Sequence, residues 1–76
     1  MKEMSRMREG ERGYVLRMEL EAGIERRLRE LGLCEGAELR CLGQSPLGDP
    51  RAYEIAGAVI ALRQGDAAHI IIEGRG

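Results

Sequence analysis

The segment GIERRLRELGL, residues 23–33, decides the architecture expected for this chain. Its large apolar residues recur at i, i+4 and i+7, at Ile24, Leu28 and Leu31. That spacing places them on one face of a helix over residues 23–31. Gly32 supplies the left-handed residue that commonly ends a helix, and Leu33 is then predicted to pack back on the last turn.

The opposite face of this predicted helix is charged. Glu25 with Arg29 and Arg26 with Glu30 are opposite-charge pairs four residues apart, a spacing that supports exposed helices. Together with Arg27, the arginines offer a basic strip for RNA or for an acidic protein surface. The interleaved glutamates neutralise most of that strip, which favours a solvated helix face.

The chain before the helix alternates with a period of two, which is typical of a β-strand over Gly13–Glu19. One alternating set is Tyr14, Leu16 and Met18, and the other contains Val15 and Arg17. Closer to the N-terminus, Met4 and Met7 lie three residues apart. That spacing is compatible with one helical turn across a barrel mouth or with a short irregular lead-in.

Period-two spacing returns after the helix. It is found in Leu39 with Cys41, in Tyr53 with Ile55, and in the run Val59–Arg63. The first pair predicts a strand that points Cys41 into the core. A turn at Gly57 joins the other two segments and predicts a hairpin.

The end of the chain adds one more strand. Residues 64–68 predict a tight helical turn, and His69–Glu73 predicts a strand with Ile70 and Ile72 facing inward. The resulting five strands and one helix contain too few residues for a two-sheet sandwich. We therefore predict a mainly β fold, a small five-stranded barrel with one short helix inserted after the first strand.

Composition indicates one ordinary folded domain over residues 1–76. Hydrophobic residues make up 43% and charged residues 33%, which argues against disorder and low complexity. Twelve Lys plus Arg against 13 Asp plus Glu give a net charge of -1, so no overall attraction to nucleic acid or anionic membrane is expected. Aromatic residues are only 3%, so platforms for stacking bases are nearly absent.

No stretch of the sequence predicts a membrane span. The longest apolar run, Ala56–Leu62, is far shorter than the roughly 20 residues that a spanning helix needs. Met1–Arg12 is charged and lacks the apolar region of a secretory signal. We expect a cytosolic protein that does not insert into the membrane.

The inventory of catalytic side chains is nearly empty. The chain has one His, two Ser and one Lys, and it has neither Thr nor Asn. Its single lysine, Lys2, follows no glycine pair, so a phosphate-binding P-loop is excluded. We expect a protein that is not an enzyme and that carries no cofactor.

Metal binding is a separate alternative, because cysteine and histidine are ligands for zinc and other transition metals. Cys34 and Cys41 are not spaced as a C-x-x-C pair, and both are expected to be reduced thiols. Cys41 is expected to pack as a small buried hydrophobe. A metal-responsive protein in which Cys34 and His69 capture iron or zinc, bridging two copies, remains open as an alternative.

The segment Gln44–Pro50 contains two prolines, a glycine and an aspartate, so it predicts a loop of fixed shape outside the sheet. Leu47 lies between turn-forming residues. It either stays exposed as part of a binding surface or folds back on the barrel, and the sequence favours neither.

Three blocks in this order resemble the FeoA family. They are Arg27-Leu28-x-x-Leu31-Gly32-Leu33-x-x-Gly36, then Pro46-Leu47-Gly48-Asp49-Pro50, then Gly57-x-x-Ile60-Ala61-Leu62-Arg63-x-x-x-Ala67 with Ile70. The lead-in Met4-x-x-Met7-x-x-Gly10-x-x-Gly13-x-Val15 is also similar. Two departures are Glu35, where the family often has proline, and methionines near the start, where it usually has leucines.

This resemblance implies an SH3-like barrel and a role in bacterial ferrous iron uptake. The implied role is that of a cytosolic accessory protein that binds the cytosolic part of the membrane permease FeoB, which carries a GTPase domain, and modulates transport. The expected contact residues are Arg27, Leu33, Leu47 and Asp49. Nucleic acid is not an expected partner, although an RNA-binding barrel using the arginine strip is a lesser alternative. A homo-oligomer is left open.

Overall fold

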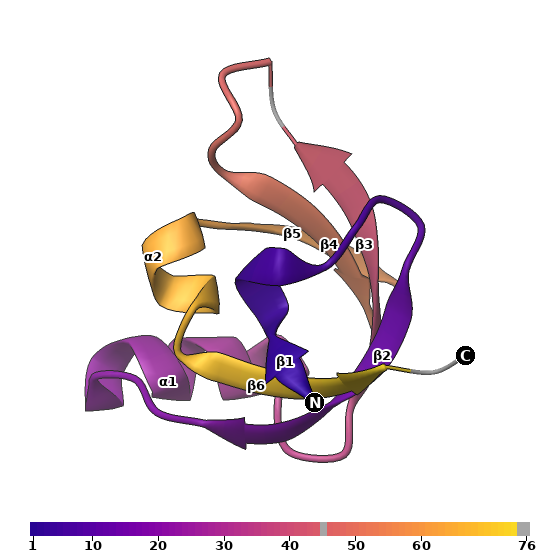
Figure 1. Cartoon of the computed structure of the whole chain (residues 1–76). Helices are drawn as coiled ribbons and strands as arrows, with labels where there is room; N and C mark the ends of the chain where they lie inside the picture. Colours follow the sequence, from indigo (N-terminus) through magenta and orange to yellow (C-terminus); the bar gives the residue numbers. More distant parts are fainter. Residues whose placement is uncertain (45, 75–76) are drawn as a thin grey trace.

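The computed structural model describes residues 1–44 and 46–74 as a curved antiparallel sheet with short helices packed on it (Figure 1). The strands are β1 (Lys2–Glu3), β2 (Arg12–Met18), β3 (Glu38–Gln44), β4 (Arg51–Ile55), β5 (Ala58–Leu62) and β6 (Ile70–Gly74). The helices are the 3-10 turn η1 (Met4–Arg6), α1 (Ala22–Glu30) and α2 (Gln64–Ala67). Their strand order in the sheet is β1-β6-β2-β3-β4-β5.

The mainly β prediction is confirmed, with one helix inserted after the first long strand. The five expected strands are β2 to β6, and the helical turn expected at residues 64–68 is α2. The prediction of five strands was incomplete, because Lys2–Glu3 adds a sixth by pairing with β6. The methionines that follow form the helical turn η1 and the residue after it, and both Met4 and Met7 are fully buried.

Helix α1 ends as the sequence indicates. The N–H of Gly32 donates to Arg29 O at 3.0 Å, and the N–H of Leu33 donates to Leu28 O at 2.9 Å, which is the Schellman arrangement. Gly32 takes a φ of +102°, a conformation that side-chain-bearing residues rarely adopt. The chain can therefore reverse at once, and Leu33 enters the core.

The burial pattern of β2 differs from the expected alternation. Its pairing with β6 shifts register between Val15 and Arg17, because a bulge there adds one residue. Val15 and Met18 are consequently both buried, whereas Tyr14 and Leu16 are exposed. The alternating set Tyr14, Leu16 and Met18 is thus split between two faces.

The core is aliphatic and nearly free of polar groups. The buried residues that form it come from every strand except β1, from the three helices, and from the residues that follow η1 and α1: Met4, Met7, Val15, Met18, Leu28, Leu33, Leu39, Cys41, Tyr53, Ile55, Leu62, Ala67, Ile70 and Ile72. Cys41 lies inside as expected, and both cysteines are free thiols. The helices in the described residues are too short and too polar to cross a membrane.

Arg51 and Tyr53 connect β4 to η1, at the other end of the strand order. Both lie on β4, yet their side chains donate hydrogen bonds to the backbone around η1, which directly follows β1. The guanidinium of Arg51 donates to the carbonyl oxygens of Met7 and Ser5, and the Tyr53 hydroxyl donates to Met4 O at 3.3 Å. Burial raises the pKa of the Tyr53 hydroxyl. The barrel is thus closed by side chains and η1 rather than by a strand pair.

Replacing Arg51 with methionine is expected to lower the free energy of unfolding by about 1–3 kcal/mol, because carbonyl oxygens at the barrel mouth lose their donor. Arg51→Lys keeps a charged donor group and should therefore lower the free energy of unfolding by less. Urea denaturation followed by circular dichroism measures both. Arg12→Met, an exposed arginine on β2, serves as control and should change stability by less than about 0.5 kcal/mol. Equal effects at Arg51 and Arg12 would contradict this role.

Candidate protein-docking surface

The loop between β3 and β4 projects from the top of the barrel (Figure 1). Gln44, expected in this loop, is the last residue of β3, and Ser45 lies outside the described residues. At the tip, the side chain of Leu47 is 93% exposed. The alternative in which Leu47 folds back on the barrel is therefore wrong, and the loop presents an apolar side chain to solvent.

Asp49 fixes the base of this loop. Its Oδ1 accepts a hydrogen bond of 3.0 Å from the backbone N–H of Gln64, the first residue of α2. The N-cap residue Arg63 makes no side-chain cap of its own, so the carboxylate of Asp49 takes that place. Asp49 is expected to act by positioning the loop against α2 as much as by direct contact.

Replacing Asp49 with alanine is expected to speed amide hydrogen exchange at Gln64 and to lower the free energy of unfolding by about 1 kcal/mol, because the N–H loses its acceptor. Asp49→Asn is the matched control, since its side-chain oxygen can still accept. Native-state hydrogen exchange measures the local effect. If alanine and asparagine behaved alike, the hydrogen bond would have no positioning role.

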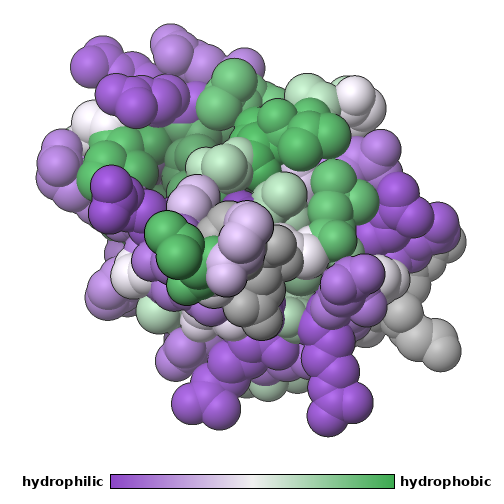
Figure 2. All heavy atoms as spheres, turned by 90° about the horizontal axis from the view of Figure 1, so that it is seen from above, coloured by the Kyte–Doolittle hydropathy of each residue, from purple (hydrophilic) through white to green (hydrophobic). Residues whose placement is uncertain are grey.

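Strand β5 adds apolar surface. It pairs only with β4 and forms one end of the sheet. Val59 is 64% exposed, Ala58 and Ala61 are exposed, and Ala61 lies beside Ala52 of β4. Figure 2, which looks down on the loop, shows apolar side chains gathered beside it and bordered by hydrophilic ones. Val59 and Ala61 share one face of β5, and Ala61 lies nearer to the loop because it is opposite Ala52 near the start of β4. We call these two residues and Leu47 at the loop tip the apolar patch.

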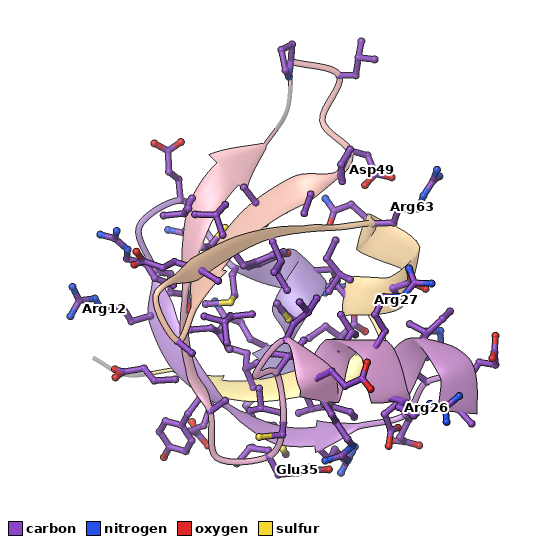
Figure 3. The ribbon with its side chains drawn as sticks, turned by 180° about the vertical axis from the view of Figure 1, so that it is seen from behind. Arg12, Arg26, Arg27, Glu35, Asp49 and Arg63 are labelled. Carbon is purple, nitrogen blue, oxygen red and sulfur yellow. The ribbon has the colours of Figure 1, made fainter. Side chains whose placement is uncertain are left out.

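Arginines lie on the same side of the molecule. Figure 3 shows Arg63 beside Asp49 at the start of α2, and Arg27 rising from α1 towards α2. Both arginines are exposed, and neither forms an ion pair with any residue that the structure describes. Arg27, Leu47 and Asp49 are therefore all available to a partner. Arg63 and Val59 were not among the predicted contacts, although both belong to or adjoin the third sequence block.

Leu33 is buried, although it was predicted to contact a partner. Its side chain is 0% exposed and belongs to the core cluster. A fully buried leucine offers no surface to a partner, so its role is packing. The physical reason is the helix stop at Gly32, which turns the chain inward.

Glu35, one of the departures from the family pattern, has a clear local role. Its carboxylate accepts two hydrogen bonds from the Arg29 guanidinium, at 2.8 and 2.9 Å. These bonds lower the pKa of Glu35, and Arg29 also pairs with Glu25 at 3.2 Å, as the helix spacing predicted. In the described residues the second expected pair, Arg26 with Glu30, does not form. The paired arginine holds the loop after α1 against the helix.

A groove lies elsewhere on the molecule, on the outer face of β3 and β4 near the end of α1. This groove of about 540 Å³ contains two arginines and two glutamates. Arg40 pairs with Glu54 at 3.2 Å, and Arg12 lies beside Arg40 in the sheet. The charges in the groove balance, so it indicates no ligand class.

The candidate metal ligands are not assembled into a centre. Cys34 lies in the connection between α1 and β3, and His69 is an exposed residue immediately before β6. Within residues 1–44 and 46–74, no group of three or more His, Cys, Asp or Glu side chains is placed to hold a metal ion. The thiol of Cys34 instead points to the carbonyl oxygen of Gly32 at 3.9 Å.

Comparisons with solved structures support the fold. The FeoA protein of Chlorobium tepidum superposes with a TM-score of 0.94 at 32% identity, covering 97% of this chain and 70% of that one. The zinc complex of FeoA from Stenotrophomonas maltophilia, described as a procaryotic SH3 domain protein, gives a TM-score of 0.81 at 28% identity, covering 96% and 91%. The expected SH3-like architecture is thus confirmed. A manganese-dependent transcriptional repressor at 21% identity shares the fold, with a TM-score of 0.87, and covers 97% of this chain and 36% of that one.

A sequence relative adds a second observation. The chain is 30% identical over 70 residues to an Fe(2+) transport protein A/Fe(2+) transporter FeoB fusion protein of Porphyromonas gingivalis. The match covers 92% of this chain and only 8% of the fusion protein. The FeoA domain model matches residues 2–74. With a match over nearly its whole length, this chain belongs to the FeoA domain family.

Proposed function

We propose that this chain is a non-enzymatic cytosolic accessory protein of ferrous iron uptake, which docks on the cytosolic part of a FeoB-type permease and modulates transport. The observation that carries the proposal is the fusion protein, in which a related segment and a FeoB transporter share one polypeptide. Fusion holds two modules at high effective concentration. Where such a domain is not fused to its transporter, association requires a surface that binds by itself.

The surface that suits this role is the apolar patch with its polar rim. An exposed apolar group on a fixed loop is typical of protein-binding surfaces, and the rim of an interface is usually polar. Leu47 provides the central apolar side chain, and Asp49 holds its loop in place. Val59 adds an exposed apolar side chain on β5, and Figure 3 shows Arg63 beside Asp49 and Arg27 on α1 near α2.

Calorimetric titration of this chain against full-length FeoB-type permease from the same organism, reconstituted in nanodiscs, tests the proposal. The titration is run without nucleotide, with GDP, and with a non-hydrolysable GTP analogue, because the expected effect on transport requires binding in at least one of these states. Saturable binding at one site, together with a changed rate of iron uptake into proteoliposomes, would support the proposal. Absence of binding in all three states would refute it.

A further inference from the structure

About half of the cationic groups in the part of the chain that the structure describes are paired with neighbouring carboxylates. The ion pairs within the described residues are Met1 N-terminus–Glu73, Lys2–Glu11, Arg6–Glu3, Arg17–Glu19, Arg29–Glu25, Arg29–Glu35 and Arg40–Glu54. They lie at the barrel's N-terminal edge, on β2 and β3, and at the side of α1 that faces the loop after it. On those faces Arg8 and Arg12 are exposed and form no ion pair with a described residue.

The side that carries the docking surface also has unpaired arginines. Arg26 and Arg27 on α1 and Arg63 before α2 are exposed, and none forms an ion pair with a described residue. In Figure 3, Arg27 and Arg63 lie on either side of α2. The carboxylate of Asp49, beside Arg63, is engaged by the N–H of Gln64 at 3.0 Å.

An arginine with no internal partner keeps its five N–H donors for an external anion, and a carboxylate matches two of them at once. Arg63 beside Asp49 at the loop base, Arg27 on α1 and the exposed Leu47 at the loop tip therefore fit an extended ligand that combines carboxylates with an apolar side chain. Asp66 on α2 belongs to the same region, but it is half-buried and forms no ion pair with either arginine. Its charge reduces the attraction without occupying the guanidinium groups.

From this arrangement we propose that the docking surface binds an acidic protein segment, whose carboxylates pair with Arg27 and Arg63 while an apolar residue covers Leu47. The inference rests on the proposed function and specifies the chemistry of the partner. Nucleic acid fits less well, because stacking needs exposed aromatic rings. Tyr53 is buried, and the one other aromatic residue of the sequence, Tyr14, is 40% exposed.

The test compares two double variants with the same change in net charge. Arg27→Glu with Arg63→Glu reverses the proposed contacts, and Arg8→Glu with Arg12→Glu reverses two exposed arginines that also form no ion pair with described residues. Arg12 lies on the opposite side of the barrel in Figure 3. All four positions are exposed, so both variants should keep the fold, which circular dichroism verifies.

Binding to the reconstituted permease is titrated at several salt concentrations. The first double variant should weaken binding by about tenfold or more and flatten its salt dependence, whereas the second should change it little. A polyglutamate peptide should compete with the permease more effectively than a single-stranded RNA of equal charge. The first double variant should also lose its affinity for that peptide.

The outcomes separate the two proposals. Binding that is insensitive to salt and to reversal of Arg27 and Arg63, yet weakened at Leu47, would overturn the acidic segment and leave the docking function standing. Equal losses of affinity in both double variants would indicate that only the net charge matters. That result would also overturn the acidic segment. RNA competing better than polyglutamate would assign the arginines to nucleic acid. Absence of any binding to the permease would overturn both proposals.

Discussion

Replacing Leu33 with alanine is expected to lower the free energy of unfolding by about 2–5 kcal/mol, because a fully buried leucine loses its transfer energy and leaves a cavity. A domain of this size has only about 4–11 kcal/mol of stability in total. The variant should therefore be partly unfolded at moderate temperature. Urea denaturation followed by circular dichroism measures the change.

Leu31→Ala is the matched control for this prediction. Leu31 is two residues earlier, at the C-cap of the same helix, but its side chain is 45% exposed. Truncating Leu31 should lower the free energy of unfolding clearly less than truncating Leu33. If the two variants were equally stable, the chain reversal at Gly32 would not bury Leu33, and this side chain would again be a candidate contact.

The helix stop shows how much of the fold the sequence predicts. The local signals are the apolar spacing over residues 23–31, the glycine after it and the apolar residue that follows. They correspond to the hydrogen bonds and the backbone angle of the Schellman turn. The same signals already implied that Leu33 packs inward. Assigning it to a contact surface was therefore in conflict with the local physics, and the structure resolves that conflict.

Other features depend on contacts between distant segments and have no local signal. The bulge between Val15 and Arg17 exists only in the pairing of β2 with β6. The two-residue strand β1 likewise exists only because β6 lies beside it. A sequence pattern describes one segment at a time, so neither the bulge nor the sixth strand was predicted.

The candidate site also combines features that have a local sequence signal with features that only the fold shows. The turn residues of Pro46–Pro50 indicate a rigid loop, but the sequence leaves both positions for Leu47 open. The hydrogen bond from the Gln64 N–H to Asp49 joins residues 15 apart, and it is visible only in the fold. Arg63 is an ordinary charged residue in the sequence. Its importance depends on its place beside Asp49 at the start of α2, which only the fold shows.

Leu47 is where binding and folding should separate most clearly. Leu47→Ala is expected to change the free energy of unfolding by less than about 0.5 kcal/mol, because the side chain is 93% exposed and gives up almost no packing. In the complex, the same side chain would be removed from water. Covering a leucine is worth about 1.5–3 kcal/mol, so its loss should weaken binding to the permease by about 10- to 100-fold.

The matched control is Leu16→Ala, since Leu16 is also exposed but lies on β2. Both variants are compared in the calorimetric titration and in urea denaturation. A selective loss at Leu47 assigns binding to the loop rather than to exposed leucines in general. An unchanged dissociation constant for Leu47→Ala would remove the loop from the interface. Because covering Leu47 is an apolar contact that salt does not screen, the loss at Leu47 should persist at high salt, where the contribution of Arg27 and Arg63 is screened.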